Sequence, residues 1–301
     1  MRHLNPDHLL TLTAVIQKAS FSKAAEHLEM SQPAVSHHIK ELERRLQLRL
    51  VERVGRRVRA TEAGGELALH AQRISLALAD AEAALTRWTD SAAGKVRIGA
   101  GATACIHLLP PMLGRLKRAN PQLEIAVSTG NTPEVVRRVE ENTLDAALVT
   151  LPISSRSLDV TPVLEDPFVA IAPRGAAQGR RSVTAVSLSR HPLVLFEEGA
   201  NTRALINQWF RDGGLAVRPV MELGSVEAIK EMVAAHLGWS LLPQLGVAQA
   251  RSRRGIEVLP LSPRLSRTLA WVIRRDKPLS RPLQQVQKAV LALGAAARAA
   301  T

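Results

Sequence analysis

Apolar and polar positions alternate with a helical period in the segment SQPAVSHHIKELERRL, residues 31–46. Ser31 is a residue type that caps helix N-termini, and Pro33 suits a first turn because its missing N–H needs no partner there. The apolar positions follow at spacings of four, three and four, which predicts one buried stripe: Val35, Ile39, Leu42 and Leu46. The opposite face then carries hydrogen-bonding side chains and no acidic group: Gln32, Ser36, His37, Lys40 and Arg44.

Two shorter helices are predicted before residue 31, and a hairpin is predicted after residue 46. Asp7 caps the first helix in this prediction, and Ser20 or Ser22 caps the second, whose sequence is FSKAAEHL. Gly55 lies between two short β-prone runs in LVERVGRRVRATEAG and marks a hairpin tip. Arginines on this hairpin suit contacts with phosphates, and they are Arg53, Arg56, Arg57 and Arg59.

Together these elements predict a winged helix-turn-helix over residues 1–60. The second helix of such a motif enters the major groove of DNA with its N-terminal residues on base edges. An amphipathic helix with a solvated polar face is the alternative interpretation of residues 31–46 taken alone. The short helix before that segment and the basic hairpin after it favour DNA binding. The local charge agrees, because residues 30–60 hold eight basic and three acidic side chains.

A long helix is predicted from Thr61 onward, and residues 61–93 are expected to serve as a linker and dimerisation helix. Its apolar positions alternate in spacing between four and three over about three heptads: Leu67, Ala71, Ile74, Leu78, Ala81, Leu85 and Trp88. Such a narrow seam favours pairing with a second helix, and packing on the helix's own chain is the alternative. Two DNA-reading heads related by a twofold axis imply a near-palindromic DNA site.

Beyond residue 94, short β-prone runs alternate with helical segments, which predicts parallel α/β sheets whose ligands bind at the carboxyl ends of the strands. Two of the predicted strands cover residues 160–164 and 168–172, and one predicted helix covers 106–118. Four strand ends run into helix starts with polar caps, which suits a small anion: they lie at Thr103, at Asn131 and Thr132, at Asn201 and Thr202, and at Ser225. Plain capping explains any one of them, whereas four that converge on a cleft favour ligand binding. Arg203 offers a charge for a carboxylate, and an exposed arginine is the alternative.

The composition is that of a globular protein of two or three domains, with 301 residues of which 46 % are hydrophobic. The net charge of +13 suggests a polyanionic partner, although most of the excess lies beyond residue 93. No run of 18 apolar residues occurs, so membrane insertion is not expected. The N-terminus has no apolar core of the signal-peptide kind, and Cys105 is the single cysteine, so a reducing cytoplasm is the expected compartment, with the protein on the nucleoid.

Catalytic and metal-binding signatures are missing from the sequence. It contains no GxSxG, HExxH, CxxC or Walker sequence, so neither an enzyme nor a bound cofactor is expected. Adjacent helical residues diverge by about 100°, so His37 and His38 do not form a metal pair. His37 is expected on the outer face, and His38 on the packed flank. Cys105 is interpreted as a small hydrophobe rather than a reactive thiol. A DNA-binding protein that organises the chromosome and has no small-molecule ligand remains the alternative to a DNA-binding protein that responds to a ligand.

Residues 20–46, SFSKAAEHLEMSQPAVSHHIKELERRL, followed by ERVGRRVRATEAG, closely resemble the winged helix-turn-helix of LysR-type transcriptional regulators. The match is dense over residues 4–66. It departs from the family pattern at Val51, where Phe is usual, and at Ala60, where Leu is common. The resemblance implies that bases are faced by Gln32, Pro33, Ser36 and His37. It implies that phosphates are faced by Ser22, Ser31, Lys40 and Arg53.

The resemblance also implies the rest of the architecture, an α/β multidomain chain whose long linker helix leads to a two-lobed α/β effector domain over residues 94–301. This domain is expected to have the type 2 periplasmic-binding-protein fold, with lobe I at 94–165 and 265–301 and lobe II at 166–264. The chain would cross between the lobes near Asp166 and near Leu265. Residues that match the family's cleft are Thr103, Asn131, Thr132, Thr150, Asn201, Thr202 and Ser225.

The implied function is sequence-specific binding of double-stranded DNA and control of transcription in response to a small, anionic effector in that cleft. A homodimer or homotetramer, built as a dimer of dimers, and RNA polymerase are the other partners that the resemblance implies. Gly101 and Ala102 stand where many relatives carry Ser or Thr.

Overall fold

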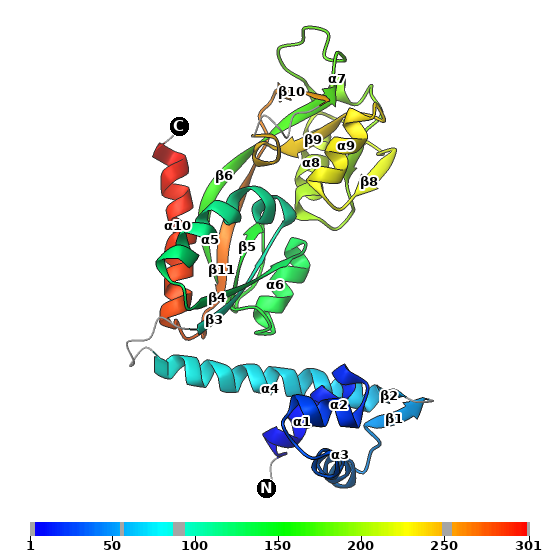
Figure 1. Ribbon diagram of the computed structural model, residues 1–301. Helices are drawn as coiled ribbons and strands as arrows, with labels where there is room; N and C mark the ends of the chain where they lie inside the picture. The colour runs from blue at the N-terminus through cyan, green and yellow to red at the C-terminus, as the bar shows by residue number, and fades with distance from the viewer. Residues whose placement is uncertain (1–3, 55–56, 87–93, 249–254, 300–301) are drawn as a thin grey trace. The chain divides into compact units, whose positions relative to one another are not determined.

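The computed structural model describes residues 4–54, 57–86, 94–248 and 255–299, and the chain divides into two compact units, residues 1–85 and 86–301 (Figure 1). The first unit contains three helices, a two-stranded hairpin and a long helix. The second contains a seven-stranded mixed sheet, a two-stranded sheet and the helices that cover them. No described helix is long and apolar enough to span a membrane.

The first unit, here called the head, is a winged helix-turn-helix whose elements follow the predicted order. They are α1 (Pro6–Lys18), α2 (Phe21–His27), α3 (Gln32–Leu46), β1 (Val51–Val54), β2 (Arg57–Ala60) and α4 (Glu62–Thr86). Three positions of the predicted apolar stripe of α3, Val35, Ile39 and Leu42, are at most 2 % exposed in the core of the head, and the fourth, Leu46, is partly buried against it. Strands β1 and β2 pair in antiparallel register, and the predicted tip at Gly55 lies outside the described residues.

The structure corrects the predicted N-terminal cap of α1 and decides between the two candidate caps of α2. The cap of α1 is Asn5 and not Asp7, because Pro6 opens the helix and the Asn5 side chain accepts a hydrogen bond from the Asp7 N–H at 2.9 Å. Ser20, rather than Ser22, caps α2. Ser31 caps α3 as predicted and accepts from the Ala34 N–H.

The second unit, here called the effector unit, is built on a mixed sheet rather than the parallel sheets that were predicted. Its strands are β3 (Gly94–Ala100), β4 (Leu123–Thr129), β5 (Ala146–Thr150), β6 (Leu158–Pro173), β9 (Ser240–Pro243), β10 (Ile256–Pro260) and β11 (Ser266–Arg274). Their order is β10-β6-β11-β5-β3-β4, with β9 also on β6. Strand β3 is parallel to β4 and β5, whereas β11 runs antiparallel to β5 and β6.

Strand β6 joins two parts of this unit. The two strands predicted at 160–164 and 168–172 are one continuous strand of 16 residues, because its first half pairs with β11 and its second half pairs with β9 and β10. The chain returns beside it just before β11, where the Phe168 N–H donates to the Leu265 carbonyl at 2.8 Å. These two adjacent segments connect the separate hydrophobic cores of the unit.

Lobe I is the part that contains β3, β4, β5 and most of β11. Helices α5 (Leu109–Ala119) and α10 (Arg281–Ala299) cover one face of its sheet, and α6 (Thr132–Glu140) covers the other (Figure 1). The helix predicted over 106–118 begins with a π-helical turn, Ala104–Leu108, before α5. Cys105 lies in this turn and is partly buried against the core, as expected of a small hydrophobe.

Lobe II contains β9, β10 and the far half of β6. Its other elements are α7 (Ala185–Leu188), β7 (Val194–Phe196), α8 (Asn201–Asp212), β8 (Met221–Leu223), α9 (Val226–Ala234) and a 3₁₀ turn (Gln244–Val247). Strands β7 and β8 pair in parallel. Both α8 and α9 begin directly after a short strand, so their N-termini lie at the carboxyl edge of that small sheet.

Candidate DNA-binding surface and effector pocket

The N-terminal half of α3 presents the predicted hydrogen-bonding face to solvent. Gln32, Pro33, His37 and Lys40 are exposed, and Ser36 is half-buried. The hairpin of β1 and β2 is here called the wing. Ser36 and Lys40 line a hollow together with Arg53 of the wing, so residues from α3 and β1 share one concave surface. Ser22 on α2 and Arg57 on β2 are exposed as well, while Arg56 lies outside the described residues.

His38 has a structural environment that differs from that of His37. Its Nδ1 lies 2.9 Å from the Thr11 hydroxyl of α1, and its ring stacks on that of His8 with 4.1 Å between the centroids. Burial, followed by the neighbouring His8 and His37, lowers the pKa of His38 below its ordinary value. A neutral His38 therefore holds α3 against α1, whereas the exposed His37 is free to face a ligand.

The seam predicted on α4 is divided between two environments. Ala71 is buried and Leu67 is half-buried in the core of the head, so these two positions pack on their own chain and are not available to a partner. Further along, Ile74, Leu78 and Leu85 are 40 %, 47 % and 67 % exposed, and Ala81 is also exposed. Trp88 lies outside the described residues.

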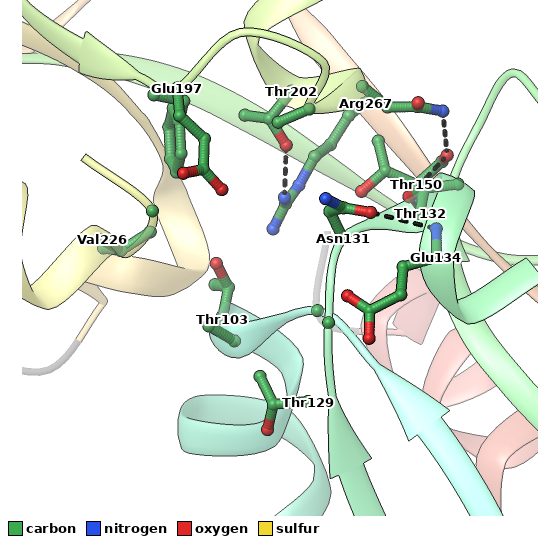
Figure 2. Close-up of a pocket in the computed structure, with 17 residues that line it drawn as sticks. Thr103, Thr129, Asn131, Thr132, Glu134, Thr150, Glu197, Thr202, Val226 and Arg267 are labelled. Atoms are coloured by element: carbon green, nitrogen blue, oxygen red, sulfur yellow. Dashed lines mark hydrogen bonds between the residues drawn. The ribbon is translucent and has the colours of Figure 1, made fainter. Parts of the chain in front are cut away.

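A pocket of about 240 Å³ lies in the effector unit, between residues of lobe I and lobe II (Figure 2). Six of the seven residues predicted for the cleft line it: Thr103, Asn131, Thr132, Thr150, Asn201 and Thr202. The seventh, Ser225, is not among the lining residues; its hydroxyl accepts from the Ala228 N–H and caps α9. Its neighbours Gly224 and Val226 line the pocket instead.

Several of the predicted polar groups in this pocket already have partners. The Asn131 side chain accepts from the Glu134 N–H at 3.0 Å as the cap of α6, and the Thr132 hydroxyl bonds the backbone of Thr150. Asn201 of lobe II donates to the carbonyls of Thr150 and Pro152 in lobe I, each at 2.8 Å. These bonds join the two lobes through Asn201 and Thr150, which both line the pocket.

Arg267 is a basic lining residue that was not predicted from the sequence. Its guanidinium is 5 % exposed and donates to the Asp166 carboxylate from Nε at 3.0 Å and from Nη2 at 2.8 Å. Its Nη1 donates to the Thr202 hydroxyl at 3.3 Å, and Figure 2 shows the guanidinium directed into the pocket. A signal existed, because opposite charges stand at the two predicted crossovers, Asp166 and the residue two positions after Leu265.

Two carboxylates also line the pocket and were not predicted, those of Glu134 and Glu197. Arg203, which was considered as a charge for a ligand, is neither exposed nor among the lining residues. It is 4 % exposed and donates to the Phe196 carbonyl and the Glu222 carboxylate. Its role is to anchor α8 to β7 and β8.

Comparison with known protein families shows which family this chain belongs to. The model of the LysR substrate binding domain matches residues 89–294, and that of the bacterial regulatory helix-turn-helix protein, lysR family, matches residues 6–65. The chain belongs to the LysR family of transcriptional regulators. The resemblance seen in residues 4–66 is therefore confirmed, and so is the fold of an N-terminal helix-turn-helix followed by an effector-binding domain.

LysR-type relatives match over most of their length. The HTH-type transcriptional regulator CysL of Bacillus subtilis (strain 168) is 30 % identical, with 88 % of this chain and 90 % of CysL covered. The regulator CfxR of Cupriavidus necator is 34 % identical over 80 % of this chain and 76 % of its own. A solved structure of a full-length OxyR variant from Pseudomonas aeruginosa has a TM-score of 0.74 and 26 % identity over 96 % of this chain and 95 % of that one. The protein is a LysR-type transcriptional regulator with a DNA-binding head and an effector-binding domain.

Proposed function

We propose that this LysR-type regulator reads a near-palindromic DNA site through the N-terminal half of α3 and contacts phosphates through its wing. The observation that carries the proposal is the shared exposed surface of the two elements. On α3, Gln32, Pro33, Ser36 and His37 face bases, while phosphates are contacted by Ser22, Ser31, Lys40, Arg53, Arg56 and Arg57. Donors at the start of a groove-binding helix suit base edges, and exposed Arg and Lys suit phosphates.

We propose that the effector carries an anionic group and binds in the pocket between the lobes. Arg267 donates only part of its five N–H groups to Asp166 and Thr202, so further donors remain for a ligand. The hydroxyls of Thr103 and Thr202 and the N-termini of α6, α8 and α9 surround the same space. Binding there would shift the balance between open and closed lobes by its differential affinity for the two states.

We infer that the regulator acts as an oligomer in which the exposed part of the α4 seam pairs with a second copy. Ile74, Leu78, Ala81 and Leu85 supply this surface, with Trp88 continuing the heptad pattern. The exposure of three large apolar side chains on one helix supports the inference. A homotetramer made as a dimer of dimers and contact with RNA polymerase at the promoter complete the proposal, both by likeness to the family.

Replacing His37 with alanine is expected to weaken binding to the specific DNA site by roughly tenfold to a hundredfold, the loss of one base contact. The measurement is a fluorescence-anisotropy titration of the full-length protein with DNA from its own promoter region, found by genome-wide mapping of bound DNA. His38→Gln is the matched control, because His38 faces Thr11 and His8. Equal losses in both variants would show that α3 docks in a different orientation.

Small molecules that bear an anionic group are expected to raise the unfolding temperature of the full-length protein. A ligand at a hundred times its Kd stabilises by about 2.7 kcal/mol, or roughly 5–10 °C for a unit of this size. The panel comprises inorganic anions, organic acids and amino acids, measured by differential scanning fluorimetry. Thr103→Val, which removes a pocket hydroxyl, should reduce the shift. A panel without any stabilising member would favour the DNA binder without an effector.

A further inference from the structure

The effector pocket contains more negative charge than a site for a simple anion would. Of the residues that the structure describes, three charged side chains line it: Arg267, Glu134 and Glu197. The charge of Arg267 is already balanced by Asp166, whose carboxylate is 1 % exposed and 2.8 Å from the guanidinium. Among the described residues, no basic side chain forms an ion pair with Glu134 or Glu197. The two glutamates, both exposed to solvent, therefore give the pocket negative charge that no described basic side chain pairs with.

The two carboxylates reach the pocket from opposite lobes. Glu134 is in the first turn of α6 in lobe I, and Glu197 directly follows β7 in lobe II. Figure 2 shows them on opposite sides of the pocket, with the Arg267 guanidinium between them. A ligand cation in the pocket would therefore meet carboxylates that both lobes contribute.

We propose that the effector is a small zwitterion of the α-amino-acid kind, whose ammonium group is held by Glu134 and Glu197 and whose carboxylate is held by Arg267 and Thr103. This inference rests on the proposed effector site and names the class of its ligand. A ligand with only negative charge would face two carboxylates that have no counter-ion. A ligand with only positive charge would leave the remaining donors of the buried Arg267 without an acceptor, which is costly.

The size of the pocket agrees with a ligand of this class. Its volume of 240 Å³ lies below the roughly 300–1,000 Å³ of pockets for drug-sized ligands, so it suits a small molecule such as an amino acid.

The arrangement also suggests how such a ligand would act on the lobes. Without a cation, carboxylates that approach from opposite lobes repel each other and disfavour closure. An ammonium group between them attracts both, so it binds the closed state more tightly than the open one. Differential affinity of this kind is what a ligand needs in order to shift a conformational equilibrium.

The test compares amino acids with their deaminated counterparts on the full-length protein. The pairs are L-alanine and propionate, L-serine and 3-hydroxypropionate, L-aspartate and succinate, L-leucine and 4-methylpentanoate, with unfolding temperature and calorimetric Kd as readouts. At least one amino acid is expected to bind, and its deaminated partner is expected to bind tenfold to a hundredfold more weakly, the loss of a charge-assisted bond. Equal binding of the partner, or binding of carboxylates alone, would overturn the zwitterion and leave the anionic effector site standing. Absence of binding by every compound would contradict both.

Variants at the glutamates locate the ammonium site. Glu134→Gln and Glu197→Gln are each expected to weaken the amino acid at least tenfold and to leave the deaminated partner unchanged or bound more tightly. Glu198→Gln is the matched control, because Glu198 is the exposed neighbour of Glu197 and is not among the lining residues. An amino acid whose affinity is the same in the wild type and in both pocket variants would show that the glutamates do not hold its ammonium group.

Discussion

Replacing Asp166 with alanine is expected to destabilise the effector unit by about 3–5 kcal/mol. The Asp166 side chain is 1 % exposed, and its carboxylate accepts two hydrogen bonds from Arg267 and one from the Leu245 N–H. Burial raises the pKa of Asp166, and the adjacent Arg267 opposes that shift. Removing the carboxylate would leave the Arg267 guanidinium, which is 5 % exposed, buried without a counter-ion.

Urea unfolding of the full-length protein, followed by tryptophan fluorescence, measures this loss. Trp209, Trp239 and Trp271 are buried in the effector unit and report on it. The control is the double variant Asp166→Leu with Arg267→Met, which removes both charges and keeps the space filled. It is expected to recover most of the stability, because a buried pair contributes little net free energy. A double variant as unstable as Asp166→Ala would mean that the unpaired guanidinium is not the cause.

Replacing Gly64 with alanine is expected to destabilise the head by about 3 kcal/mol. Gly64 lies in the first turn of α4, and a Cβ on it would stand 1.8 Å from the carbonyl oxygen of Leu50. That oxygen also accepts a hydrogen bond from the Thr61 N–H at 3.1 Å, so it cannot move away without loss of the contact between the wing and α4. The collision is with backbone, which leaves the side chains no means of relieving it.

Gly65→Ala is the control, and its effect is expected to have the opposite sign. Among the described residues, a Cβ placed on Gly65 meets no atom within 4 Å apart from its chain neighbours and its own helix backbone, so alanine there only improves helix propensity, by about 0.5–1 kcal/mol. Residues 1–85 contain no tryptophan, so fluorescence does not report on the head. The two variants are instead distinguished by hydrogen exchange of peptides from the head, measured by mass spectrometry. Faster exchange in both variants, or in neither, would rule out the proposed contact at Leu50.

The sequence predicted those residues of the effector pocket whose role depends only on their own turn or helix. Thr103, Asn131, Thr132, Asn201 and Thr202 were recognised because a strand end followed by a capped helix is a local pattern. Arg267 was missed because its partners, Asp166 and Thr202, are 101 and 65 residues away in the chain. Glu134 was missed because an acidic residue in the first turn of a helix has an ordinary local explanation, and Glu197 because nothing next to it in the chain marks a loop glutamate as part of a pocket.

Helical periodicity is a property of neighbouring residues, so the stripe of α3, the exposed position of His37 and the order of elements in the head follow from residue spacing alone. The direction of a strand is not set by its own residues. Strand β6 became one element, and the sheet became mixed, because partners distant in the chain pair with it. The same holds for Leu67 and Ala71, whose heptad spacing does not distinguish a second copy from the core of their own head. That choice depends on which apolar surface is nearest in space, and only the folded chain determines it.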